Sequence, residues 1–476
     1  MLAWVKTLDD FLERTKTRYL GLGLLIAWVY CSWFSGSIFG PGNDAAAIST
    51  LRVSLLFSAV GLAVLVFRPR KRTPLSPVTI FLSALIVTLT TFLSSFLSEG
   101  PALLAISAAG GFVSAVLWVA WGELLCQIGQ DITESCIPAS LVVFAVACIV
   151  VYIMPAPFSG ILSALLPLAS CVMLLLGRNS QPSDFLFPAA KEPFSHVFPS
   201  LAKLALCSMT CSAANGFVVT VTSFGLGEAF FSTESLLLFY IVGGIAAAII
   251  SLLSLTFASR LNFSLLYQCV IPLIVFSLSL KALGGTNNTA LALVLACTAS
   301  LCVDALFYAI FARITMQRFC LPSETFGIFR AAAQAGFLIG GLLSAWSVAE
   351  GIDSLAMSLG FICICVVMLP LFLHLQKRFD TAPADEQERP ADSASSIQGK
   401  DVLLEIIDAY KLSAREAEVL RFLSKGRSVP YMREAMTLSK STIETHIKHI
   451  YAKVDVHSKQ ELIDLIESYQ ESAGMS

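Results

Sequence analysis

Charged side chains are scarce in this sequence. Asp, Glu, Lys and Arg make up 13% of its 476 residues, whereas hydrophobic residues make up 56%, and the mean hydropathy is +0.78. This balance excludes an ordinary soluble globular protein of this size and indicates a membrane protein. The formal net charge of −2 averages over very different regions, so it identifies no partner.

Motifs that carry catalytic chemistry are also missing. The sequence contains no phosphate-binding glycine loop and no nucleophile elbow. Its 13 cysteines stand without metal-ligand spacing, mostly inside apolar runs, as small core residues do. His446 and His449 could share a helix face, but no Cys or carboxylate at a fitting spacing completes a metal site, which favours packing or DNA contact. We therefore expect no enzyme activity, no cofactor and no metal site.

Long apolar runs dominate the first 374 residues. Each run is long enough to cross about 30 Å of hydrocarbon as a helix. Twelve such spans are predicted, at 19–39, 50–67, 78–97, 102–125, 137–154, 158–177, 201–225, 234–257, 264–283, 289–311, 327–348 and 353–374. The fold class is therefore all-α, with a polytopic membrane helix bundle over 19–374.

The charges between the spans set the orientation. Lys and Arg gather before the first span and after the second, sixth, eighth, tenth and twelfth. The alternate connections contain neither, at 40–49, 98–101, 226–233, 284–288 and 349–352. The positive-inside rule then places both termini in the cytoplasm. Residues 1–18 carry seven charged side chains and no cleavage site, so we expect an uncleaved cytoplasmic lead-in.

The twelve spans divide into two sets of six. The longest connection, 178–200, separates them, and the basic segments 68–72 and 258–262 occupy equivalent places in the two sets. This duplicated architecture resembles the major facilitator superfamily of transporters. The family's Gly-x-x-x-Asp-Arg-x-Gly-Arg-Arg loop is reduced here to Arg68-Pro-Arg-Lys-Arg72. The loss of its glycines and aspartate favours a sensor over a working transporter.

A few polar residues inside the spans are candidate ligand-binding positions. Asp304 lies inside the tenth span and Arg330 near the start of the eleventh, where a salt bridge would lower the cost of holding both in the membrane. In the arrangement of the resembled family, spans one, four, seven and ten line a central cavity. That resemblance adds Trp33, Trp118 and Asn215 to the candidates.

Structural explanations compete with this pocket. Trp28 and Trp121 could anchor the chain at the membrane interface, and Glu123 could simply reach cytoplasmic water. Gly336-x-x-x-Gly340 is most simply explained by close helix packing.

A change in composition marks the end of the membrane region. Residues 375–399 are rich in Pro, Ala, Asp and Glu and read as a flexible acidic linker before a second domain at 400–476. That domain holds 11 Lys and Arg against 12 Asp and Glu, so it is not basic as a whole. From Arg421 to Lys453, however, seven cations face two anions, which is the pattern expected for contact with nucleic-acid phosphates.

The same stretch predicts a helix-turn-helix. A helix from Ser439 buries one face with apolar residues at helical spacing, which are Ile443, Ile447, Ile450 and Val454. Its opposite face carries hydrogen-bonding side chains. Ser428 caps a preceding short helix with Pro430 in its first turn, and residues 437–439 form the turn between the two.

These residues resemble the LuxR-type DNA-binding domain, a small four-helix domain. The matching positions are Leu412-Ser413-x-Arg415-Glu416-x-Glu418-Val419-Leu420, Gly426, Ser439, Ser441-Thr442-Ile443, His446, Ile450, Lys453, Val456 and Leu462. The resemblance implies that the second helix of the motif enters the major groove of double-stranded DNA. It gives as DNA-contacting residues Lys440, Ser441, Thr442, Glu444, Thr445, Lys448, His449 and Lys453.

Within this set, Glu444, Thr445 and Lys448 are expected at base edges, and Lys440 and Lys453 at phosphates. Glu444 is acidic where many relatives are basic, and Arg433 stands where a small residue is usual. The last helix, from about Ser458, is expected to pair two domains into a homodimer on an inverted-repeat site.

The sequence as a whole predicts a transcription regulator embedded in a bacterial inner membrane. Its lipid-embedded half would sense a small-molecule signal that the sequence does not identify, and its cytoplasmic domain would bind DNA. A working transporter that also regulates transcription is the alternative. A third possibility is that the helices only anchor a domain regulated by another protein.

Overall fold

The structure is a computed structural model of the whole chain, which forms two compact units, Met1–Pro383 and Ala384–Ser476. Each unit is described by itself. The described residues are 16–34, 38–39, 44–67, 72–97, 100–182, 185–190, 193–224, 233–258, 263–284, 286–380, 406–424, 436, 440–456, 461–462 and 465.

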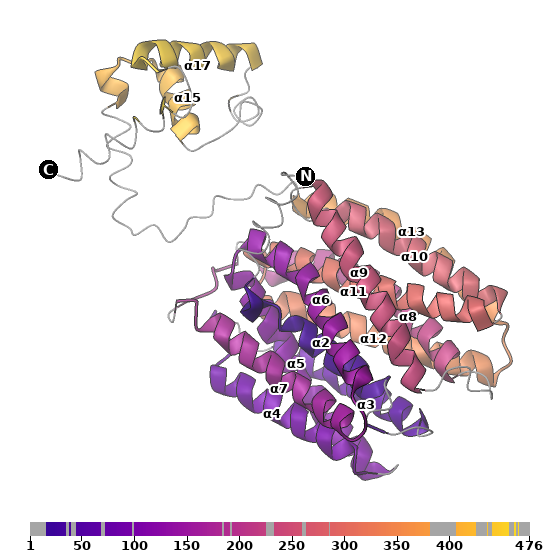
Figure 1. Cartoon of the computed structure of the whole chain (residues 1–476). Coiled ribbons are helices and arrows are strands. Elements are labelled where there is room, and N and C mark those ends of the chain that lie inside the picture. Colours follow the sequence, from indigo (N-terminus) through magenta and orange to yellow (C-terminus); the bar gives the residue numbers. More distant parts are fainter. Residues whose placement is uncertain are drawn as a thin grey trace. The chain divides into compact units, whose positions relative to one another are not determined.

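The first unit is a bundle of helices (Figure 1). After a short 3-10 turn, η1 (Thr17–Tyr19), its first six helices are α2 (Leu22–Trp33), α3 (Asp44–Val66), α4 (Pro77–Ser94), α5 (Pro101–Gln127), α6 (Gln130–Ile153) and α7 (Phe158–Arg178). The second six are α8 (Phe194–Phe224), α9 (Thr233–Ala258), α10 (Phe263–Leu283), α11 (Thr286–Met316), α12 (Pro322–Ala349) and α13 (Ser354–Asp380). Each of the twelve predicted spans falls on one of these helices.

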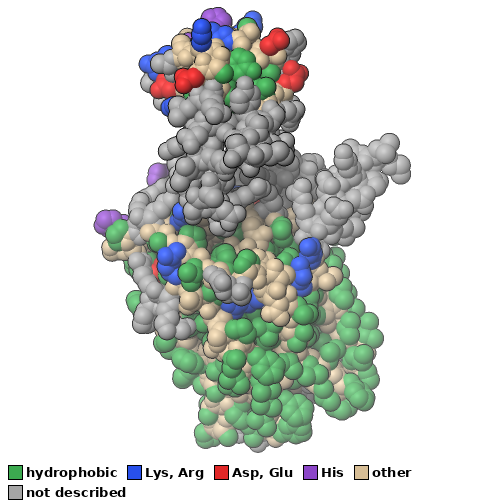
Figure 2. Space-filling model, turned by 90° about the vertical axis from the view of Figure 1, so that its left-hand side faces the viewer, with side chains coloured by type: hydrophobic (Ala, Val, Ile, Leu, Met, Phe, Trp, Pro, Cys, Tyr) green, Lys and Arg blue, Asp and Glu red, His purple; other side chains and the backbone are tan. Residues whose placement is uncertain are grey.

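Length and composition suit most of these helices to a membrane. Within the described residues, ten are long and apolar enough to cross it, and Leu22–Trp33 and Val270–Leu283 are shorter apolar helices. Large hydrophobic side chains are exposed on the outside of the bundle, among them Val64, Val78, Ile153, Phe158 and Val367. On the face seen in Figure 2, hydrophobic side chains cover most of the bundle, and Lys and Arg gather toward one end. This distribution is the one expected of a surface that faces lipid.

Helix packing repeats between the two sets of six. In the first set, α2 packs on α6 and α7, α3 on α5, and α4 on α5 and α7. In the second set, α8 packs on α12 and α13, α9 on α11, and α10 on α11 and α13. The sets meet through α3 with α12 and through α6 with α9, which are equivalent pairs. The predicted division into six and six is therefore confirmed.

Glycines allow the closest of these approaches. A Cβ at Gly336 or Gly340 of α12 would overlap the backbone carbonyl of Met209 or Ala213 of α8. A Cβ at Gly23 of α2 would likewise overlap a backbone carbonyl of α6, and α2–α6 is the pair equivalent to α8–α12. The prediction that Gly336 and Gly340 serve close packing is confirmed.

Some details differ from what the sequence suggested. The first span ends as a helix at Trp33 rather than at 39, because glycines follow at 36, 40 and 42. The start of the predicted linker is helical, because α13 continues to Asp380; residues 381–405 lie outside the described part. Trp28 and Trp121 are not interface anchors. Both are buried and donate their indole N–H within the bundle, to Thr91 at 3.0 Å and Ser170 at 2.9 Å.

The described part of the second unit contains α15 (Ala414–Ser424) and α17 (Lys440–Val454). Ten buried apolar residues form its own core, which are Ile406, Leu412, Val419, Leu420, Leu423, Ile443, Ile450, Val454, Val456 and Leu462. The predicted short helix from Ser428 and its turn to Ser439 lie outside the described residues, apart from Met436.

Candidate DNA-binding interface and membrane site

The helix α17 is amphipathic, with one face fixed by the core. Ile443 and Ile450 are fully buried, Val454 is 3% exposed, and Ile447 packs against them. The predicted apolar stripe is confirmed. This burial turns the opposite face of the helix outward.

The outward face carries several of the predicted DNA contacts. Thr445, Lys448, His449 and Lys453 are exposed, so they lie on the surface that would meet a groove or a phosphate. Thr442 is half-buried. The side chains of three further candidates lie outside the described residues, namely Lys440, Ser441 and Glu444.

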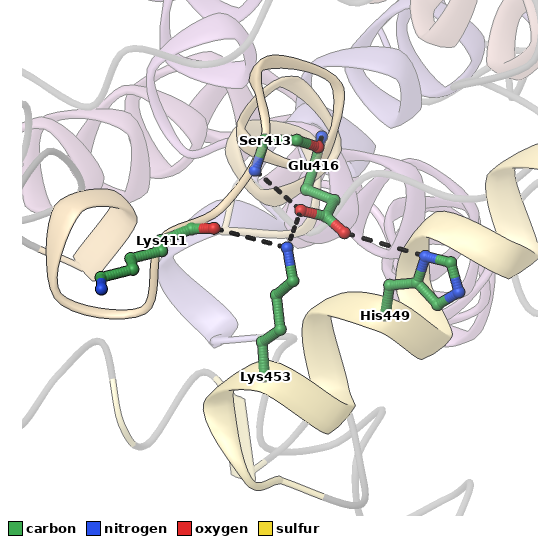
Figure 3. A network of polar contacts seen from close by, with 5 residues as sticks. All are labelled: Lys411, Ser413, Glu416, His449 and Lys453. Carbon is green, nitrogen blue, oxygen red and sulfur yellow. Dashed lines mark hydrogen bonds and ion pairs between the residues drawn. The ribbon is translucent and has the colours of Figure 1, made fainter.

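Glu416 connects α15 to α17 (Figure 3). Its backbone N–H lies 3.3 Å from the Ser413 hydroxyl oxygen, and its carboxylate accepts the Ser413 N–H at 2.7 Å, which is a capping box at the start of α15. The same carboxylate pairs with the Lys453 ammonium at 2.6 Å and lies 3.8 Å from Nδ1 of His449. One buried side chain thus fixes both the start of α15 and the side of α17 that carries predicted DNA contacts.

The chemistry of Glu416 follows from these contacts. The hydrogen bond from Lys453 and those from Ser413 lower the pKa of the Glu416 carboxyl from 4.5 to about 2. The carboxylate is therefore ionised at neutral pH and holds the Lys453 side chain, which is 40% exposed, against the domain. Lys453 also donates to the backbone carbonyl of Lys411 at 3.4 Å. Lys453 thus has an internal partner in addition to its predicted phosphate contact.

Sequence reasoning assigned no role to Glu416 beyond its place in the family pattern. The signal was nevertheless present, because Ser413-x-x-Glu416 before an apolar run is a capping-box signature. Its contact with Lys453, 37 residues away in the chain, has no local signature.

In the membrane unit, three of the five predicted ligand-binding residues come together. Arg330 on α12 pairs with Asp304 on α11 at 2.9 Å, and its guanidinium lies over the ring of Trp118 on α5, 4.0 Å from the centroid. The predicted salt bridge is therefore present. Because α5 belongs to the first set of helices, this stacked cation also joins the two halves.

The remaining two candidates are placed differently. Asn215 on α8 is buried, and its carbonyl oxygen has no hydrogen-bond partner among the described residues. Trp33 packs edge-on against Trp28, with ring centroids 5.3 Å apart. It also touches an apolar cluster that includes Phe34, which directly follows α2, and Tyr240 of α9.

A second ion pair crosses between the halves. Arg313 on α11 binds Glu134 on α6 at 2.8 Å, and their side chains are 17% and 4% exposed. Gln130 also donates to this carboxylate, at 2.7 Å. Glu123, for which contact with cytoplasmic water was one explanation, is instead buried and accepts the backbone N–H of Leu75 at 2.9 Å. Neither carboxylate had been assigned its partner, because each partner lies on a distant segment.

These features define a polytopic membrane bundle joined to a helix-turn-helix domain. Residues 410–466 match the family described as bacterial regulatory proteins of the luxR family. The C-terminal part of the chain is therefore a LuxR-family DNA-binding domain.

Curated relatives match only a short part of the chain. The chain is similar to the Fimbriae Z protein of Salmonella typhimurium, with 42% identity over 59 residues, which is 12% of this chain and 28% of the relative. It is also similar to the Fimbriae Z protein of Escherichia coli K12, with 39% identity over 81 residues, which is 17% of this chain and 39% of the relative. The chain thus spans between about a quarter and two fifths of these relatives.

The membrane unit resembles a solved transporter in fold. The human organic anion transporter MFSD10 superposes with a TM-score of 0.52 and 14% identity, over 75% of this chain and 99% of that chain. At this identity the likeness concerns the fold alone. It agrees with the transporter-like, six-and-six architecture.

Proposed function

We propose that this protein is a membrane-bound transcription regulator whose helical unit senses a ligand or membrane signal and whose C-terminal domain binds promoter DNA as a dimer. The observation that carries the proposal is that one chain contains both a membrane-spanning bundle and a LuxR-family domain. Attachment to a membrane has a function for a DNA-binding domain only if the membrane unit controls its activity or its location.

The proposed location is the inner membrane of a bacterium, with both termini in the cytoplasm. The support is the alternation of Lys and Arg between successive connections, together with the need of a DNA-binding domain to share a compartment with DNA. Reporter fusions after Arg72 and after Lys377 should indicate a cytoplasmic location, and a fusion after Asn288 should indicate an external one. An external signal at Lys377 would contradict both the orientation and the regulatory role.

The proposed signal site is the centre of the bundle. Asp304 and Arg330 form its charged part, with Trp118 stacked against the arginine, and Asn215 supplies a buried carbonyl oxygen that has no partner among the described residues. Trp33 is the remaining candidate for this site. A buried ion pair is stable only while both charges are compensated, so a ligand that engages either charge changes how the two halves pack.

Regulation is tested by recovering DNA with the full-length chain from membranes. The wild type should enrich a small set of genomic fragments that share an inverted repeat. A variant with Thr445→Ala and Lys448→Ala should lose this enrichment while its membrane content is unchanged. Equal recovery of all fragments by the wild type would exclude sequence-specific regulation.

Active transport coupled to regulation is the second candidate, favoured by the fold likeness to a transporter. The reduced loop at 68–72 argues against it. Reconstituted vesicles distinguish the two, because a sensor binds its ligand without accumulating it, whereas a transporter moves it across the vesicle membrane.

A further inference from the structure

An exposed histidine lies beside the carboxylate that holds Lys453. Nδ1 of His449 is 3.8 Å from Oε1 of Glu416, whereas Oε2 of the same carboxylate pairs with the Lys453 ammonium at 2.6 Å (Figure 3). The His449 and Lys453 side chains are 61% and 40% exposed, and the Glu416 side chain is 5% exposed. One buried carboxylate therefore has two exposed cationic or potentially cationic partners on the predicted DNA-binding side of α17.

The two partners differ in how firmly they hold a positive charge. Lysine keeps its ammonium near neutral pH, whereas histidine is the side chain whose charge ordinarily changes between pH 5 and pH 8. Contacts from Lys453 and Ser413 lower the pKa of the Glu416 carboxyl to about 2, so this carboxylate stays ionised throughout that range. Of these residue types, only histidine changes its charge there.

Glu416 is the charge that acts most strongly on His449. The other charged side chains described on α15, on α17 and directly beside them are all exposed, and they are Asp408, Lys411, Arg415, Glu418, Arg421, Lys448 and Asp455. Arg415 and Glu418 pair with each other at 2.8 Å. Water and salt screen exposed charges, whereas the buried carboxylate at 3.8 Å is screened less.

We propose that DNA binding by this domain is coupled to protonation of His449, which replaces Lys453 on Glu416 and frees the lysine for a DNA phosphate. The two side chains stand four residues apart on one helix, so both can reach the same carboxylate. A protonated imidazole has to close the distance to Oε1 only from 3.8 Å to about 3 Å to donate a hydrogen bond. The exchange avoids leaving a buried carboxylate without a positive partner, which would otherwise oppose the release of Lys453.

The coupling has a definite direction, and it rests on the proposed DNA binding. A phosphate that attracts the Lys453 ammonium favours the protonated form of His449, and by reciprocity protonation favours DNA binding. Affinity should therefore rise as the pH falls from 8 to 6. Because partly exposed ion pairs contribute little, we expect a gain of about two- to fivefold. The added phosphate contact should steepen the salt dependence by about one unit of slope.

The test is the affinity of the full-length chain, in phosphatidylcholine nanodiscs, for a mixed-sequence DNA duplex at pH 8 and pH 6 and at several salt concentrations. Mixed-sequence DNA suffices because phosphate contacts do not depend on sequence. The wild type should bind more tightly and with a steeper salt dependence at pH 6. His449→Gln, which cannot take up the proton, should show neither change. Lys453→Met should also show neither change, because it has no ammonium to release.

The matched control is His446→Gln. His446 lies one turn earlier on α17 and is half-buried, so this variant should keep the wild-type pH dependence whatever its affinity. Glu416→Gln should bind equally at the two pH values and show the steeper salt dependence already at pH 8, because nothing then holds Lys453. Circular dichroism at both pH values checks that each variant is folded.

The response of Lys453→Met is decisive. If this variant keeps the wild-type pH dependence, His449 meets the phosphate itself and the exchange is wrong, even if Glu416→Gln does not fold. Loss of the pH dependence in His446→Gln but not in His449→Gln would also overturn the proposal. A wild type that binds DNA equally at both pH values overturns the coupling but leaves the proposed function standing, whereas one that binds no DNA at either pH contradicts both.

Discussion

Replacing Glu416 by glutamine should lower the stability of the DNA-binding unit far more than its position near one helix end suggests. The carboxylate accepts the N–H of Ser413 and pairs with Lys453 across the domain. Glutamine keeps the shape and can still accept one hydrogen bond, but it carries no charge. The substitution therefore removes the link to α17 while leaving most of the cap of α15.

The size of the effect follows from the pKa of this carboxyl. A decrease from 4.5 to about 2 corresponds to at most about 3 kcal/mol, at 1.36 kcal/mol for each unit. Lys453 is 40% exposed, so water screens part of that interaction. We therefore expect Glu416→Gln to cost about 1–2 kcal/mol at pH 7.

The pH dependence has a definite sign. The pKa of Glu416 is lower in the folded domain than in the unfolded chain, so its ionised form stabilises the fold. This contribution is complete above about pH 4.5 and is lost as the pH falls toward about 2. The difference between wild type and Glu416→Gln should thus be constant near neutrality and shrink in acid.

The assay is urea unfolding of residues 384–476, a compact unit with its own core, followed by circular dichroism at several pH values. Glu418→Gln is the matched control, since Glu418 is 48% exposed and pairs only at the surface with Arg415. It should cost less than about 0.5 kcal/mol. Equal losses in the two variants, or a Glu416 difference that persists unchanged at pH 3, would refute the reasoning.

Three further predictions concern other parts of the chain. Asp304→Asn should destabilise the bundle by about 3–5 kcal/mol, and neutralising Arg330 as well should recover part of this in a double-mutant cycle of thermal unfolding; additive losses would mean the residues are not coupled. Lys448→Ala should relax discrimination at one base position of each half-site, measured by binding-site selection, whereas an unchanged preference would mean a different docking of α17. Gly340→Ala should lower the melting temperature in detergent, since its Cβ would overlap the α8 backbone, while Gly360→Ala, in open space, should not.

The sequence predicted the repetitive features of the fold well. Twelve apolar runs, their division into two sets of six and the buried stripe of α17 are all periodic patterns, and the structure confirms them. Close packing of α12 could also be anticipated from the spacing of Gly336 and Gly340, although its partner α8 could not. These features depend on residues close together in the chain.

Most contacts between segments far apart in the chain could not be predicted from the sequence. Asp304 and Arg330 were matched because each is a rare charge inside a span, which leaves few partners. Glu134 was overlooked at a helix start, where a carboxylate is common, and its partner Arg313 lies 179 residues away. Trp28 and Trp121 could be interpreted as anchors at the membrane interface, because nothing in the sequence shows which hydroxyl accepts an indole N–H.

Two ion pairs among the described residues of the membrane unit share one helix. Asp304 and Arg313 both lie on α11, the first paired with α12 and the second with α6 of the other half. Breaking a buried pair by removing one partner costs about 3–5 kcal/mol, and reversing a 1:99 equilibrium requires about 5.5 kcal/mol. A ligand that compensates one released charge therefore supplies an energy of the right size to change how the halves pack.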